Sequence, residues 1–315
     1  ILIFNLVYLI VFNFNTESVL YILAKFSTTN LIAFGLITNY NFYKQFFIRY
    51  FKYIIAIMLF LGYFFVGIGG TTGGGQRLAI GFNPNDVGLF GAFGVLSIML
   101  FTPNWFKSKK ELFLLLSFML LTLLSGSKAA LLNVLLGSLF IYRLSFKIVA
   151  IGIVVFLTFL VTPKLGFTTS IDRLMSSEKT FETRNEVFEI GILTIKDAFF
   201  QGHGIDKYGW TNPKYWPKPE DALGPHSTYL SIGIMYGIIF GSLFLLILLS
   251  ILMKAIKSYF KFKDVFVKFC VLIIVLTFIN GFFESLIIAV NEFITILFWF
   301  AVGVLGYYKL NYKKC

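Results

Sequence analysis

The sequence is poor in charged residues, cysteine and proline. Only 13% of its 315 residues are charged while 58% are hydrophobic, and it has two cysteines, seven prolines and two histidines. Cys270 lies within an apolar run and Cys315 ends the chain, which excludes a disulfide framework in the polar segments. This composition excludes a soluble protein, because the core of a soluble protein with 315 residues cannot bury so large a fraction of hydrophobic residues. The bilayer is therefore the solvent of this chain.

Long uncharged runs, rich in phenylalanine, each have the length of about one membrane crossing. Backbone groups in hydrocarbon must be paired within the protein, and the lack of apolar–polar alternation favours helices over a barrel. We therefore predict an all-α fold, a polytopic transmembrane helix bundle of about ten spans. The runs lie near residues 1–14, 18–39, 53–69, 87–102, 111–124, 128–142, 148–162, 228–253, 266–285 and 292–308.

The runs also predict a division into three parts. N-terminal transmembrane helices occupy 1–162, an extracytoplasmic loop subdomain occupies 163–227, and C-terminal transmembrane helices occupy 228–315. Because the chain opens inside an apolar run without Met or a signal-peptide pattern, we expect that an N-terminal piece is missing.

The net charge of +12 comes from basic residues in the stretches between apolar runs. In a soluble protein this excess would indicate nucleic acid, but here it indicates topology, because cytoplasmic loops are enriched in Lys and Arg. An even number of predicted spans separates each basic cluster from the next, which places 70–86, 125–127 and 163–227 outside. Lys25 and the polar residues 27–30 lie within the second span, which could instead be broken or re-entrant. The clusters are Lys44, Arg49 and Lys52; Lys107, Lys109 and Lys110; Arg143 and Lys147; Lys254, Lys257, Lys261, Lys263 and Lys268; and Lys309, Lys313 and Lys314.

The outward segment 163–227 is the only stretch long enough for a subdomain. It mixes both signs of charge and carries tryptophan and tyrosine among proline and glycine, which is typical of a folded loop facing carbohydrate or the membrane surface. Residues 183–186 read Thr-Arg-Asn-Glu, a capping-box sequence followed by apolar positions. This pattern predicts a surface helix over 184–200, ended by Gly202 and Gly204.

Arg77 follows the glycine-rich residues 69–76 and could belong to a phosphate-binding loop. The run lacks the Gly-Lys-Ser/Thr ending of a nucleotide-binding loop and lies on the side without ATP, so nucleotide binding is improbable. The alternative is a flexible hairpin in which Asn85 or Asp86 caps the next helix.

Arg184 would occupy the first position of the helix predicted over 184–200. A cation there opposes the helix macrodipole, and an anion bound beside it relieves the mismatch. A diphosphate suits an arginine next to free backbone N–H groups. The alternative is a surface arginine paired with Glu182 or Asp172.

His226 stands where the outer loop re-enters the membrane at the predicted eighth span. The positive end of that helix disfavours imidazolium, which would keep the ring neutral and able to accept a proton. A lone histidine at a helix start is more often structural, and His203, in a glycine-flanked turn, is the rival base. Lys128 and Glu284, near the outer ends of their spans, could border an outward cavity. The sequence shows no metal-ligand cluster, paired catalytic carboxylates or nucleophile elbow, so we expect chemistry without metal or cofactor.

Four short motifs share the predicted outward side. They are Arg77 with Gly81-Phe82-Asn83-Pro84-Asn85; Leu124-Ser125-Gly126-Ser127-Lys128-Ala129-Ala130-Leu131; Thr183-Arg184-Asn185; and Pro225-His226-Ser227-Thr228-Tyr229-Leu230 with Gly233 and Gly237. Their order and spacing resemble the O-antigen ligase and polymerase superfamily over about residues 70–310. Lys128 departs from the pattern, because the family often has arginine there.

The resemblance implies a GT-C-like glycosyltransferase of the bacterial inner membrane, with its active site facing the periplasm or cell exterior. Its donor would be a polyprenyl-diphosphate-linked oligosaccharide and its acceptor a glycan hydroxyl, without nucleotide sugar or metal. Carried over residue by residue, Arg77 and Arg184 would bind the diphosphate, and His226 would activate the acceptor for inverting attack. The supporting residues would be Asn83, Asn85, Lys128 and Tyr229.

A polysaccharide polymerase is favoured within the superfamily, because polymerases occur in the widest range of bacteria; a ligase would transfer the glycan to lipid A core. The expected partners are the lipid-linked donor, the glycan acceptor and the bilayer, with a flippase and a chain-length regulator as candidates and no nucleic acid. A transporter for lipid-linked sugars would share the topology but needs no folded outer loop with a candidate base. A non-catalytic scaffold would tolerate alanine at His226, Arg77 or Arg184.

Overall fold

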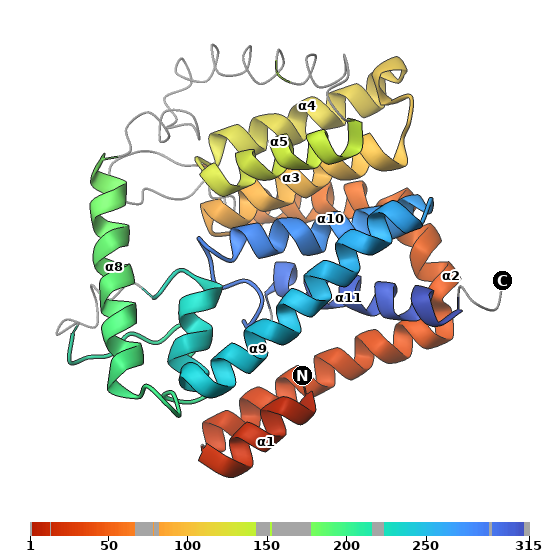
Figure 1. Ribbon diagram of the computed structural model, residues 1–315. Coiled ribbons are helices and arrows are strands. Elements are labelled where there is room, and N and C mark those ends of the chain that lie inside the picture. Colours follow the sequence, from red (N-terminus) through yellow and green to blue (C-terminus); the bar gives the residue numbers. More distant parts are fainter. Residues whose placement is uncertain are drawn as a thin grey trace. The chain divides into compact units, whose positions relative to one another are not determined.

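A computed structural model of the chain describes residues 2–12, 14–66, 78, 82–142, 152, 178–215, 224–289 and 292–311. Throughout these segments the regular structure is helical, which confirms the all-α prediction (Figure 1). The chain forms two compact units. The first comprises Ile1–Tyr40 and Glu178–Cys315, and the second comprises Asn41–Ser177. The predicted division at 162 and 227 concerns sides of a membrane and stays a prediction.

The helices follow the predicted apolar runs closely in most of the described chain. They are α1 (Leu2–Phe12), α2 (Thr16–Val66), α3 (Pro84–Phe101), the 3₁₀ helix η1 (Trp105–Lys107), α4 (Lys109–Leu124), α5 (Lys128–Tyr142), α8 (Glu178–Asp197), α9 (Thr228–Lys261), α10 (Val265–Asn280) and α11 (Phe293–Asn311). Four of them, α2, α3, α9 and α11, contain stretches long and apolar enough to cross a membrane, and α1, α5 and α10 are shorter apolar helices. The run predicted near 148–162 lies outside the described residues, apart from residue 152.

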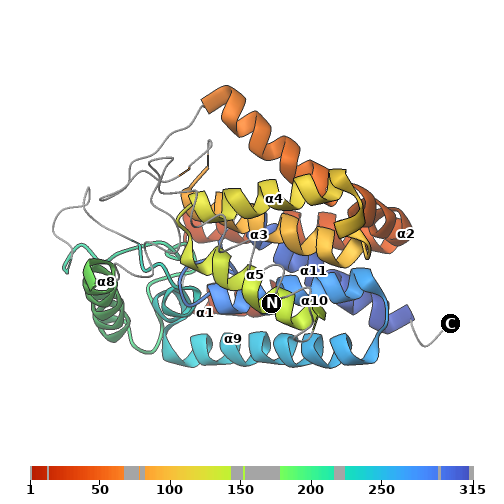
Figure 2. The same cartoon turned by 90° about the horizontal axis from the view of Figure 1, so that it is seen from above.

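In the second unit, α3 packs closely on α4 because glycine recurs on one of its faces. A Cβ added to Gly91 would lie 2.8 Å from Phe118 O, and one added to Gly94 would lie 2.7 Å from the Phe118 ring. Small residues let helix backbones approach where no water drives the association. Figures 1 and 2 show α3 lying against α4 and α5, and nearly every residue of α3 is buried.

The second predicted span is helical through its polar run, so the alternative in which it is broken there is wrong. Thr28 Oγ1 donates to Ala24 O at 2.9 Å, and Thr29 Oγ1 donates to Lys25 O at 2.7 Å. These hydroxyls bond to carbonyls of their own helix and leave it intact. Helix α2 instead leaves helical geometry at Asn39 (φ −135°, ψ 34°) and then continues to Val66.

Helix α8 begins at Glu178, six residues before the predicted start at 184. The capping-box interpretation of residues 183–186 is therefore wrong, and Arg184 occupies the seventh position of the helix, away from its N-terminus. An acidic first residue favours the earlier start, because carboxylates suit the positive end of a helix. The helix ends at Asp197, and Gly202 follows with φ 73°.

Helix α8 packs on the first turns of α9 in the first unit (Figure 1). A Cβ on Gly191 would lie 3.2 Å from Leu230 Cδ1, and one on Gly233 would lie 2.6 Å from Ile195 Cδ1. Residue numbers rise together along both helices, so the two run parallel. The residues of α8 before Gly191, Arg184 among them, therefore extend past the start of α9 on the side where His226 lies.

Helix α9 is interrupted at Gly237, where φ is 63° and ψ is −170°. Only glycine adopts this conformation readily. The loop at 199–204 supplies the hydrogen bonds that the interruption removes from the helix, which satisfies the freed backbone groups. These bonds are His203 N–H to Ile234 O (2.7 Å), Gly204 N–H to Met235 O (3.1 Å) and Ile238 N–H to Phe199 O (2.7 Å).

Candidate active site

His226 immediately precedes the N-cap of α9 and has a constrained backbone. Its φ is 41°, and within the described residues no other non-glycine residue has a positive φ. Such a conformation is unfavourable by about 1–3 kcal/mol and persists only where the surroundings fix it. The fixing contacts come from the next two residues: Ser227 Oγ donates to Gly281 O at 3.3 Å, and Thr228 N–H donates to the same oxygen at 2.8 Å. The His226 side chain remains 46% exposed, so a substrate can reach it.

Glu284 is the acidic partner of His226. Its Oε2 lies 3.5 Å from His226 Nδ1, and its side chain is 16% exposed. The two residues are far apart in sequence and meet because Thr228, at the start of α9, donates to Glu284 O from both its backbone N–H (3.1 Å) and its hydroxyl (2.9 Å). A carboxylate beside Nδ1 favours the tautomer with a proton there, which leaves the Nε2 lone pair free to accept one. This arrangement suits a general base.

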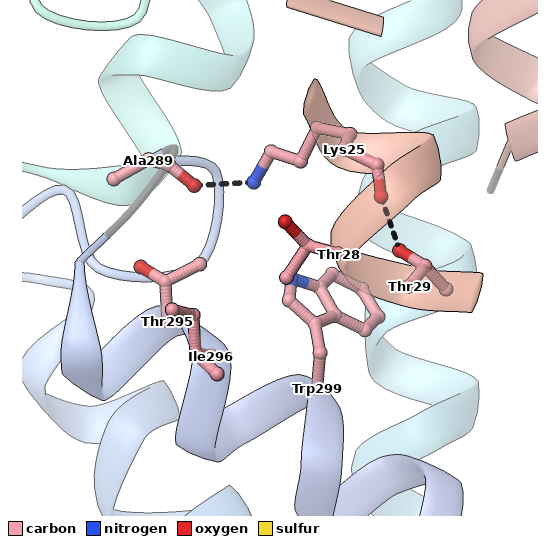
Figure 3. Close-up of a pocket in the computed structure, with 7 residues that line it drawn as sticks. All are labelled: Lys25, Thr28, Thr29, Ala289, Thr295, Ile296 and Trp299. Atoms are coloured by element: carbon pink, nitrogen blue, oxygen red, sulfur yellow. Dashed lines mark hydrogen bonds between the residues drawn. The ribbon is translucent and has the colours of Figure 1, made fainter. Parts of the chain in front are cut away.

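Side chains from two helices, α2 and α11, hold the non-helical segment that follows Glu284. Backbone carbonyls in apolar surroundings need partners, and here successive carbonyls each accept a side-chain hydrogen bond. Figure 3 shows Lys25 reaching Ala289 O beside Thr295 and Trp299, around a small pocket. The bonds are Thr295 Oγ1 to Leu286 O, Trp299 Nε1 to Ile287 O (3.1 Å), Tyr21 Oη to Ile288 O and Lys25 Nζ to Ala289 O. We call these four donors the carbonyl clamp.

The predicted supporting residue Tyr229 lies on the first turn of α9. Its hydroxyl donates to Phe278 O at 2.7 Å, and its ring lies 4.5 Å from that of Phe282. Tyr229 therefore ties the start of α9 to the end of α10, the helix that leads to Glu284.

His203, the rival base, has a structural role. Its Nε2 lies 2.7 Å from Thr194 O, and because a carbonyl only accepts, this nitrogen carries the proton. The ring lies 4.7 Å from that of Trp210. His203 thus joins α8 to the loop that fills the interruption in α9.

In the second unit, the residue that caps the start of α3 is not one of the two that were predicted. Asn83 is the N-cap with Pro84 as the first helical residue, and Asn83 Oδ1 accepts from Asn85 N–H at 2.9 Å. The alternative in which Asn85 or Asp86 caps the helix is wrong, because proline favours the first helical position and leaves the cap to the residue before it.

Lys128 begins α5 directly after the turn at 125–127, as predicted. Ser127 Oγ accepts from Ala130 N–H at 3.3 Å and caps the helix. A Cβ on Gly88 would meet both Ser125 Oγ and Ser127 Cβ within 2.8 Å, so the start of α3 lies against this turn. The second unit therefore brings two of the four motifs together, and the first unit holds His226, Glu284 and Tyr229.

The two arginines are placed less completely. Arg77 lies outside the described residues. Arg184 is described as part of α8, beyond the start of α9, and its side chain lies outside the description. Sequence reasoning missed the pairing of Glu284 with His226, although it placed Glu284 near the outer end of its span, at the border of a possible outward cavity.

The fold and the histidine–carboxylate pair define a helical membrane protein with a candidate general base at the start of an apolar helix. A family model described as O-antigen ligase matches residues 87–246, just over half of the chain. The protein belongs to the O-antigen ligase family. The matched region contains Lys128, Arg184, His226 and Tyr229. No curated protein and no solved structure matches the chain.

Proposed function

We propose that this protein is a membrane glycosyltransferase that polymerises a polysaccharide such as O-antigen, capsule or exopolysaccharide. It transfers a polyprenyl-diphosphate-linked glycan to a hydroxyl of an acceptor sugar. The observation that carries the proposal is the pair formed by His226 and Glu284, on a constrained backbone at the start of α9. Family membership supports the reaction class.

In the proposed reaction, His226 Nε2 takes the proton of the acceptor hydroxyl as its oxygen attacks the anomeric carbon of the donor. The bond between that carbon and the diphosphate oxygen breaks, and its electron pair leaves with the polyprenyl diphosphate. Attack opposite the leaving group inverts the anomeric centre. The Glu284 carboxylate stabilises the imidazolium that forms and holds the ring in place.

Arg77 and Arg184 bind the diphosphate in this proposal. Guanidinium groups match phosphate oxygens in geometry and charge, and their attraction strengthens as the leaving group gains charge. We propose that they supply this stabilisation without a metal ion. The parallel packing of α8 on α9 supports the role of Arg184, because the helix extends past the start of α9 on the His226 side. Asn83, Asn85, Lys128 and Tyr229 are the supporting residues in this proposal.

The proposal includes a bacterial inner-membrane protein of about ten spans with a GT-C-like fold. The basic ends of the apolar helices face the cytoplasm, and His226 faces the periplasm or cell exterior. A flippase that delivers the donor and a regulator of chain length would be its functional partners.

A ligase that transfers the glycan to lipid A core is the second candidate. The description of the matching family model, O-antigen ligase, favours it. The two candidates share His226, Glu284 and the arginines, and differ in the acceptor. A transporter for lipid-linked sugars would use no general base.

The deciding experiment supplies purified lipid-linked repeat unit to the protein in liposomes without metal or nucleotide. A lipid-linked ladder is the result expected of a polymerase. Product formed only when lipid A core is added identifies a ligase, and no glycosyl transfer to either acceptor refutes the enzyme proposal.

The two histidines provide a matched pair of variants for the same assay. We expect His226→Gln to lower turnover by about 10²–10⁴-fold, the range for loss of a general base. His203→Gln keeps a donor for Thr194 O and should retain turnover within about threefold of wild type. Normal turnover by correctly inserted His226→Gln would exclude the proposed base.

A further inference from the structure

A second candidate binding site lies between α1 and the far half of α9, away from His226. A groove of about 530 Å³ is lined by Phe4 of α1 and by one face of α9. The α9 residues are Leu243, Leu246, Ile247, Ser250, Ile251 and Lys254. Lys254 is 26 residues beyond Thr228, about 39 Å along the path of the helix, so the groove is separate from the candidate active site.

The dimensions of the groove match one leaflet of a bilayer. From Leu243 to Lys254, α9 rises about 16 Å, and half of the hydrocarbon core measures about 15 Å. Phe4 closes the groove at its Leu243 end, where the Phe4 ring packs on those of Phe240 and Phe244 at 5.6 Å each. The wall between is apolar, and Leu246 is 61% exposed. An extended acyl chain fits this shape.

Two polar side chains lie near one end of the groove, and the rest of its lining is apolar. Lys254 is exposed at the end of the groove far from Phe4, and Ser250 is exposed one turn before Lys254. Within the described chain, neither the Lys254 ammonium nor the Ser250 hydroxyl makes a hydrogen bond or ion pair with another side chain. A cation at the depth where a leaflet ends is placed to meet a lipid phosphate, with a hydroxyl near the ester groups.

We propose that this groove is a binding site for an anionic phospholipid, with one acyl chain against α9 and the phosphate at Lys254. The ligand is a bulk membrane lipid and not the glycan donor, whose reacting diphosphate belongs at the opposite end of α9. Phospholipid binding at the groove requires only that α9 crosses the membrane, whereas the distinction from the donor lipid rests on the proposed function.

Native mass spectrometry of the full chain tests the site with dioleoyl phosphatidylglycerol and dioleoyl phosphatidylcholine, which share the same acyl chains. We expect wild type to retain one phosphatidylglycerol in preference to phosphatidylcholine by about fivefold or more, the contribution of one lysine near a membrane surface. Lys254→Glu should abolish this preference, and Lys254→Arg should keep it. The control Lys309→Glu makes the same charge change in the last turn of α11 and should leave the preference unchanged.

A second variant tests the groove itself. Ser250→Trp fills it from an exposed position, so the protein should fold and bind neither lipid there. Retention of phosphatidylglycerol by Lys254→Glu and Ser250→Trp at wild-type levels would overturn the proposal. Displacement of phosphatidylglycerol by an equimolar polyprenyl phosphate would also overturn it and assign the groove to the donor lipid.

Discussion

Replacing Glu284 by glutamine removes the charge beside His226 and keeps the shape of the side chain. At the observed 3.5 Å, a carboxylate and an imidazolium attract by about 1 kcal/mol in water and about 5 kcal/mol at an effective dielectric constant near 20. His226 is nearly half exposed, which favours the lower part of this range, about 2 kcal/mol. Because the imidazolium forms during the reaction, this energy is lost from the transition state. We therefore expect kcat to fall about 30-fold.

The assay is steady-state glycosyl transfer in liposomes at several donor concentrations, which gives kcat and KM. The KM for the donor should stay near its wild-type value, because Glu284 acts through His226 and does not contact the donor. Glu284→Asp keeps the charge and should recover part of the rate. Glu189→Gln removes an exposed carboxylate from α8 and should have no effect. A kcat for Glu284→Gln within twofold of wild type would refute the general-base pair.

Three further predictions concern what holds the site and the fold. Tyr21→Phe leaves Ile288 O without its hydrogen-bond donor, and we expect the free energy of unfolding to fall by about 1–3 kcal/mol and kcat to fall as well. The control Tyr50→Phe, at an exposed position of the same helix, should change neither stability nor kcat. Gly237→Ala places a Cβ 2.6 Å from Gly202 N at a residue with a positive φ, so the thermal midpoint of unfolding should fall sharply. The control Gly209→Ala adds its Cβ in open space and should leave the midpoint unchanged. Equal midpoints for the two variants would contradict the interrupted-helix account. Lys52→Met leaves the buried Glu111 carboxylate unpaired at a cost of about 3–5 kcal/mol. The double variant Lys52→Met/Glu111→Met should regain most of this stability in thermal denaturation, and no recovery would contradict the ion-pair account.

Much of the helical layout follows from the sequence, because an apolar run of sufficient length has few alternatives to a helix in a bilayer. The predicted run 128–142 coincides with α5, and the motif at residues 225–230 contains the start of α9. The errors lie where local signals compete. The capping box at 183–186 is a valid cap by composition, but the chain continues the helix back to Glu178. Asn83 rather than Asn85 caps α3, because Asn83 directly precedes the proline that begins the helix.

The sequence alone determined that the protein is an all-helical membrane protein, that it resembles the O-antigen ligase family, and that His226 and His203 were the two candidate bases. Hydropathy and short motifs are local properties, so a linear reading can evaluate them. Only the tertiary structure distinguished the two histidines, because it places His203 against Thr194 O and sets Glu284 beside His226. These partners, like the carbonyl clamp, are brought together by packing between helices distant in sequence. Local composition does not encode which distant side chains meet.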